Sequence, residues 1–175
     1  MTPPVPVSNF PWMRSRAHIE KVKKKKMVTT DQIKNLRDKT GISVMQCKRA
    51  LEKAEGDETK ALQFLKEESA LIAEKKSERA LRSGVIGAYI HAGGGMGALV
   101  KLCCETDFVS KNPEFKSLAE ELAMHIAAMN PAAVADLLDQ PFVKTPQISV
   151  GELIRGSIQK FGENIIVEEF NRQVV

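Results

Sequence analysis

Residues 85–109, VIGAYIHAGGGMGALVKLCCETDFV, hold two apolar runs separated by a glycine-rich loop. The first run, 85–91, is rich in β-branched and aromatic residues, and the second, 98–105, is apolar over most of its length. Two such runs around a short glycine loop predict an antiparallel β-hairpin. The loop lacks the glycine spacing of a nucleotide-binding motif, and a strand follows it where such a site needs the start of a helix. We therefore do not expect a nucleotide to bind there.

The four residues Thr106, Asp107, Phe108 and Val109 follow the second predicted strand directly. After them, Asn112-Pro113 is typical of a helix start. The apolar positions of that helix recur at helical spacing: Phe115, Leu118, Ala119, Leu122, Ile126 and Met129. Asp107 and Phe108 are thus predicted on a turn between a strand and a helix, where functional residues are common. Composition alone would instead make Asp107 a turn-capping carboxylate and Phe108 a contact of the core.

Upstream, residues 29–66 predict three short helices. Thr29, Ser43 and Asp57 are helix-capping residues, and Gly41 and Gly56 separate the helices. The positions expected to face the core are Ile33, Leu36, Val44, Cys47, Leu51, Ala54, Ala61, Leu62 and Leu65. Three short helices within about forty residues are typical of a ubiquitin-associated-like (UBA-like) binding module. Met45 and Cys47 would be ordinary core residues in such a bundle.

Downstream, Ser149 and Glu152 have the spacing of a capping box and predict a further helix that Gly162 ends. Residues 164–170 predict a third strand beside the hairpin. The predicted fold is α+β: an N-terminal three-helix UBA-like domain, a helical linker, and a three-stranded antiparallel sheet packed with helices. The expected boundaries are 1–28 for a basic extension, 29–66 for the helical domain, 67–83 for the linker and 84–175 for the α+β core.

The positive charge of the chain is concentrated at its start. The whole sequence has 26 basic and 22 acidic residues. Residues 1–26 contain seven of the basic residues and one acidic residue, Glu20, which leaves 19 basic and 21 acidic residues elsewhere. The proline-containing extension is predicted to be disordered, or Met27 is the working start. A lysine run is weak evidence for a particular partner, so no specific nucleic acid is expected, although a basic ribosome- or RNA-associated protein remains an alternative.

Several classes of function find no support in the composition. No apolar run approaches the ~20 residues of a membrane-spanning helix. Three cysteines are too few for a disulfide scaffold and favour a reducing compartment. A cytoplasmic protein is expected, with an organelle matrix as the alternative. Adjacent Cys103 and Cys104 should point to opposite faces of a sheet. The histidines are scattered, so we expect no metal site, no cofactor and no catalytic residues, and the protein is not expected to be an enzyme.

Several stretches, in order along residues 29–172, resemble the bacterial elongation factor Ts family. They are LRDKTG (36–41), CKRAL (47–51), GD (56–57), YIH (89–91), CETDFV (104–109), HIAAMNP (125–131), QPFV (140–143) and FGENI (161–165). The resemblance implies a guanine-nucleotide exchange factor for the translational GTPase elongation factor Tu. Cys103 and the pair Arg82-Ser83 depart from the family pattern without altering the TDFV block.

The resemblance also implies which residues contact the GTPase. Lys34, Val44 and Met45 occupy positions where the three-helix domain of the family docks on the nucleotide-binding domain. Asp107 and Phe108, flanked by Thr106 and Val109, correspond to a wedge that disturbs the Mg²⁺ site and loosens GDP. A UBA-like adaptor without exchange activity is the alternative, but it leaves the TDFV turn unexplained.

Long members of the family have two homologous core halves, whereas this sequence contains a single hairpin of the repeated type. The chain therefore resembles the short, single-core form. Such forms tend to dimerise, with a second subunit supplying what the missing half would provide. We expect a homodimer through the sheet region.

Overall fold

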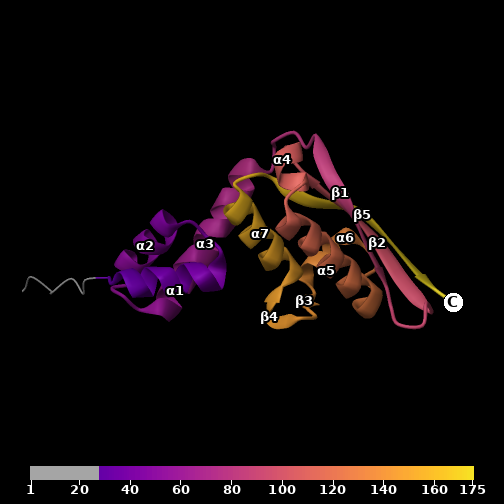
Figure 1. Ribbon diagram of the computed structural model, residues 1–175, viewed down its shortest axis with the longest axis horizontal. Coiled ribbons are helices and arrows are strands. Elements are labelled where there is room, and N and C mark those ends of the chain that lie inside the picture. The colour runs from indigo at the N-terminus through magenta and orange to yellow at the C-terminus, as the bar shows by residue number, and fades with distance from the viewer. Residues whose placement is uncertain (1–27) are drawn as a thin grey trace, which may run out of the picture.

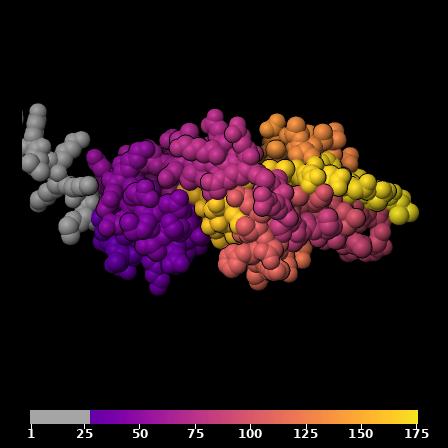
Figure 2. Space-filling view, turned by 90° about the horizontal axis from the view of Figure 1, so that it is seen from above, coloured from indigo at the N-terminus to yellow at the C-terminus, as the bar shows by residue number. Residues whose placement is uncertain are grey.

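A computed structural model describes residues 28–175 of the protein. The predicted disorder of the basic extension, 1–28, concerns residues that lie outside this range, apart from Val28. Figure 1 shows three helices at one end of the described part and a twisted sheet at the other. Figure 2 shows the same two parts following one another along the long axis of the molecule.

Three capped helices form the N-terminal part: α1 (Thr30–Thr40), α2 (Val44–Lys53) and α3 (Glu58–Lys76). Thr29 and Gln32 form a capping box at the start of α1, and Gly41 ends that helix with a left-handed φ of 67°. The buried core of this part comprises Leu36, Ile42, Cys47, Ala50, Leu51, Ala54, Ala61 and Leu65. The prediction that Val44 and Met45 belong to the core was wrong. Both are exposed, because they occupy the first turn of α2 on the side away from α1 and α3.

Helix α3 continues well beyond the three-helix core. Its second half runs to Lys76, through part of the charged segment for which a helical linker was predicted. There Ile72 and Ala73 pack against the hydrophobic core of the sheet part. Since one unbroken helix joins the two parts, the proposed boundaries at 66/67 and 83/84 stay a prediction.

The C-terminal part is built on a three-stranded antiparallel sheet of order β1-β2-β5: β1 (Ser83–Ile90), β2 (Met96–Cys104) and β5 (Ile165–Val174). The hairpin pairs Ser83 with Cys104 and Ile90 with Gly97. The second ladder pairs Cys104 with Ile165 and is interrupted by an irregularity between Lys101 and Leu102. The predicted hairpin and third strand are thereby confirmed.

Among residues 28–175, helices cover one face of this sheet and leave the other face uncovered (Figure 1). Helix α5 (Pro113–Met129) lies against β1 and β2, and α7 (Val150–Phe161) lies beside it and contacts α3. A Cβ added at Gly87 would stand 2.4 Å from the backbone oxygen of Ala119, so the absence of a side chain lets α5 approach the strand closely. Met129 was expected on the buried face of α5 but is 44% exposed, because it occupies the last turn of the helix.

The sequence analysis missed the elements between α5 and α7. They are the short helix α6 (Val134–Asp139) and a small two-stranded sheet, β3 (Pro141–Phe142) with β4 (Thr145–Ser149). Fully buried His125 connects them to α5: its Nε2 is 3.1 Å from Gln140 Oε1, and the Val143 backbone N–H donates to its Nδ1 at 3.2 Å. His125 is therefore a hydrogen-bonded core residue.

The packing at Gly87 can be tested by substitution. Gly87→Ala should lower the free energy of unfolding by about 2 kcal/mol, because the new methyl group forces α5 and β1 apart. The matched control is Gly95→Ala in the hairpin loop, where an added Cβ meets nothing within 4 Å. Urea denaturation of both variants measures the effect, and equal stability of the two would contradict the close approach.

Burial lowers the pKa of His125 below its ordinary value of 6.5. The unfolded chain therefore takes up a proton near that pH that the folded protein does not bind. The free energy of unfolding should fall as the pH drops from about 7.5 to about 5.5. In His125→Gln this fall should be smaller, whatever the absolute stability of the variant. Denaturant titrations at both pH values provide the measurement, and an unchanged fall would contradict the assignment.

Candidate functional site

The TDFV block forms a single helical turn, α4 (Asp107–Ser110), between β2 and α5. Within this turn, Val109 and Ser110 are buried, whereas Phe108 is 80% exposed. An aromatic side chain this exposed contributes little to the core, so the interpretation of Phe108 as a core contact was wrong. The turn thus has one side that anchors it and one side that presents a phenyl ring to solvent.

Thr106 precedes the turn in the N-cap position but does not cap it with its side chain. Its hydroxyl donates to Glu163 Oε1 at 2.5 Å, and its backbone N–H donates to Glu163 Oε2 at 3.0 Å. Glu163 lies in the corner between α7 and β5. At the other end of α4, the Ser83 hydroxyl donates to the Ser110 hydroxyl at 2.8 Å. The turn is therefore fastened to the sheet part at both ends.

Asp107 is exposed and forms an ion pair with Lys111 at 2.5 Å. Lys111, one helical turn further on, holds the pKa of the Asp107 carboxyl below its ordinary value. An ion pair between two exposed side chains contributes little to stability. Its consequence here is that the residue preceding Phe108 carries a carboxylate that is paired with an ammonium group.

The residues expected to contact a partner from the three-helix part are exposed as well. Met45 is 61% exposed, Val44 follows the Ser43 cap of α2, and Lys34 is exposed on α1. Figure 1 places α1 and α2 far from α4, with α3 between them. The structure thus brings Thr106, Asp107, Phe108 and Val109 together and leaves the second set as a separate surface.

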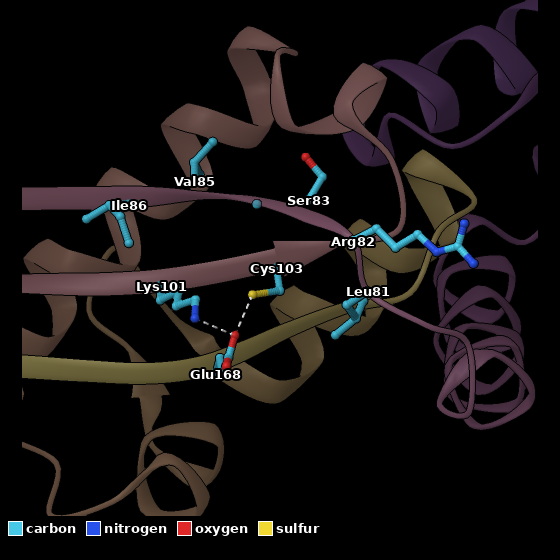
Figure 3. Close-up of a pocket in the computed structure, with 9 residues that line it drawn as sticks. Leu81, Arg82, Ser83, Val85, Ile86, Lys101, Cys103 and Glu168 are labelled. Atoms are coloured by element: carbon cyan, nitrogen blue, oxygen red, sulfur yellow. Dashed lines mark hydrogen bonds and ion pairs between the residues drawn. The ribbon is translucent and has the colours of Figure 1, made fainter.

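A hollow of about 380 Å³ lies on the helix-free face of the sheet (Figure 3). In it, Lys101 Nζ lies 3.0 Å from Glu168 Oε2, and the Cys103 thiol donates to the same oxygen at 2.9 Å. Burial, together with Glu168, raises the pKa of Cys103 to about 11. The thiol is thus protonated at neutral pH and is a poor nucleophile.

A larger cleft, of about 620 Å³, separates the three-helix part from α7. Its walls are mostly apolar, and Lys66 and Glu152 at its edge pair with each other at 3.7 Å. The Gln159 side-chain amide is buried there without a hydrogen-bond partner among residues 28–175. This cleft lies along the contact of α3 with α7 and does not gather a set of reactive groups.

Within residues 28–175, no three His, Cys, Asp or Glu side chains gather in a way that could hold a metal ion. The three cysteines are free and buried. No helix in this range is both long and apolar enough to cross a membrane.

The sequence analysis quoted the FGENI stretch but assigned it no role, and so missed two residues. Glu163 holds Thr106, as described above. Buried Asn164 donates through its side-chain amide to the backbone oxygens of Ser77 and Arg79, both at 3.3 Å. The sequence signal for these residues was that two polar residues, Glu163 and Asn164, stand between an apolar helix and an apolar strand. Their hydrogen-bond partners are far away in the sequence, so the sequence did not reveal them.

Comparison with known proteins identifies relatives over most of the chain. The family described as Elongation factor TS matches residues 24–136 and 105–175. The chain is 38% identical to Elongation factor Ts of Carboxydothermus hydrogenoformans, with 83% of this chain and 88% of the relative aligned. It is 37% identical to that of Microcystis aeruginosa (85% and 77%) and 35% identical to that of Thermodesulfovibrio yellowstonii (83% and 94%).

Two details concern the single hairpin. The two matched segments overlap at residues 105–136. The alignment with the Carboxydothermus relative extends over 191 positions, whereas the chain has 175 residues, so that relative has residues without counterparts here. The family match covers most of the chain, and the relatives are 35–38% identical to it.

The chain therefore belongs to the elongation factor Ts family and is a translation elongation factor that acts in protein biosynthesis.

Proposed function

We propose that the protein is a guanine-nucleotide exchange factor for elongation factor Tu and that α4 is the element that promotes GDP release. The observation that carries the proposal is the exposed ring of Phe108 on a turn whose next two residues are buried. Exposing a phenyl ring on a fastened turn has no benefit for folding. It does suit insertion between side chains of a partner protein, where aromatic anchors often dominate the binding energy.

The mechanism requires no covalent step. In a GTPase, Mg²⁺ neutralises phosphate charge and holds the switch segments around the nucleotide. A ring that enters between the helices beside that site displaces the groups that hold the ion, and Asp107 brings a negative charge to the same place. GDP then leaves faster. The coupling is reciprocal, so GDP weakens binding of the exchange factor by the same ratio.

The second surface, Lys34, Val44 and Met45, acts as the tether in this proposal. Exposed apolar side chains of α2 supply contact area, and Lys34 supplies a charge. Because the tether and the wedge are on one chain, docking of the first raises the effective concentration of the second. The separation of the two surfaces in the structure suits a partner held at two places.

The apolar side chains on the helix-free face of the sheet support a further proposal, a homodimer. Ile86, Ile90 and Leu99 lie on β1 and β2 and are more than half exposed. Sheets in single chains cover such a face with helices or a second sheet. A second copy of the chain offers an identical face and would bury both.

The wedge can be tested by measuring release of fluorescent GDP from elongation factor Tu. Phe108→Ala should reduce the maximal release rate by roughly 30-fold, which corresponds to about 2 kcal/mol for one aromatic anchor. Met45→Ala is the matched control from the other surface, and it should raise the concentration needed for half-maximal release with little change in the maximal rate. If wild type does not accelerate release, the exchange function is wrong and the adaptor alternative is favoured. If Phe108→Ala is fully active, only the wedge is wrong.

The dimer can be tested by placing a charge on the exposed sheet face. Wild type should have the mass of two chains in light scattering at micromolar concentration. Leu99→Lys should have the mass of one, because a buried unpaired ammonium group opposes the contact. Leu71→Lys on α3 is the control: Leu71 is 57% exposed and Leu99 is 52% exposed. A monomeric wild type would rule the dimer out.

A further inference from the structure

The α7–β5 corner holds the start of α4 through one carboxylate. Glu163 accepts the hydroxyl of Thr106 at 2.5 Å and its backbone N–H at 3.0 Å, two hydrogen bonds across 57 positions in the sequence. Hydrogen bonds to a charged acceptor are the stronger kind. Thr106 itself is exposed to solvent. Its hydrogen bonds to Glu163 help to fix the course of the chain after β2.

The contact is reciprocal. Glu105 Oε1 accepts the backbone N–H of Asn164 at 2.6 Å. Residues 105–106 and 163–164 thus each give a carboxylate to a backbone N–H of the other pair, and we call these four residues the clasp. Buried Asn164 is fixed in turn by the carbonyls of Ser77 and Arg79, just beyond α3. The clasp is therefore hydrogen-bonded to the segment after α3, and its residues hold α4 without belonging to that helix.

The use of the Thr106 hydroxyl is informative. A threonine in an N-cap position commonly accepts a hydrogen bond from an N–H of its own helix. Here the hydroxyl makes no such bond, since it is turned to Glu163. A helix of four residues has little stability of its own. The direction in which α4 leaves the sheet is therefore set by tertiary contacts, among them the two hydrogen bonds between Glu163 and Thr106.

We propose that Glu163 is a positioning residue for nucleotide exchange: by holding Thr106, it fixes the direction in which α4 presents Phe108 to the GTPase. This inference rests on the proposed exchange function. Glu163 need not touch the partner. Buried Val109 and the Ser83–Ser110 hydrogen bond still anchor α4 when Glu163 is removed, so the loss should affect the ring's direction more than the fold.

The experiment is a double-mutant cycle between Glu163 and Phe108, read as release of fluorescent GDP from elongation factor Tu. Glu163→Ala should lower the maximal release rate about tenfold, since two charge-assisted hydrogen bonds are lost. The half-maximal concentration should change little, because the tether on α1 and α2 is intact. In the Phe108→Ala background, Glu163→Ala should have no further effect, because it acts only through the ring.

Two further variants complete the test. Thr106→Val removes only the hydroxyl and should give a smaller loss of the same kind, which also vanishes without Phe108. If Glu163→Ala proves unstable in thermal unfolding, the result for Thr106→Val decides whether the positioning role of Glu163 holds. Glu121→Ala is the matched control: its carboxylate pairs only with Lys144 among residues 28–175, and the rate should be that of wild type.

The outcomes separate the two proposals. A wild-type protein that does not accelerate release overturns the exchange function, and the inference with it. An active wild type with fully active Glu163→Ala and Thr106→Val overturns the inference alone. The same holds if Glu163→Ala slows release by an equal factor with and without Phe108, since its effect would then be a general loss of structure. A loss confined to the background that retains the ring supports the positioning role.

Discussion

The close contact of α5 with the inner face of the β1–β2 hairpin is the constraint on which the rest of the structure depends. The helix can approach because Gly87 has no side chain where Ala119 passes. Phe115, Leu122 and neighbouring residues of α5 then fill the space above the strands. Since α4 is the only link between β2 and α5, its ends are set by this contact. The place of Phe108 is thus a consequence of how a helix packs on a sheet.

Consecutive residues of the turn have opposite roles. Val109 and Ser110 are buried and fix α4, whereas Asp107 and Phe108 face solvent. One helical turn places neighbouring side chains on different sides, so Val109 and Ser110 can anchor α4 while Asp107 and Phe108 are presented to solvent. The fastening by Thr106 and Ser110 keeps this division intact. A binding residue on a rigid turn loses less conformational entropy on docking than one on a free loop.

Local signals in the sequence were enough to predict much of this fold. Thr29, Asn112 and Ser149 cap helices through contacts within three residues, and the glycine loop between two apolar runs made the hairpin. Helical periodicity wrongly predicted that Val44 and Met129 are buried. Periodicity shows which face of a helix is apolar, but it does not show where along that face the packing element ends. The site divided in the same way. The turn was predictable from its strand and its helix, but Glu163 was not, since its hydrogen bonds to Thr106 span 57 residues and exist only in the folded chain.

The three-stranded sheet connects the two proposals about partners. Its inner face is covered by α5 and α7, and its outer face bears exposed Ile86, Ile90 and Leu99. The two segments that match the family overlap at residues 105–136, and the aligned relatives have residues that this chain lacks. The residues that the relatives have in addition and the uncovered face point the same way: the one core formed by residues 28–175 has one such face, and no helix or strand of these residues covers it. A second copy would bury that face while leaving α4, which lies beyond the end of the sheet in Figure 1, free to meet another protein.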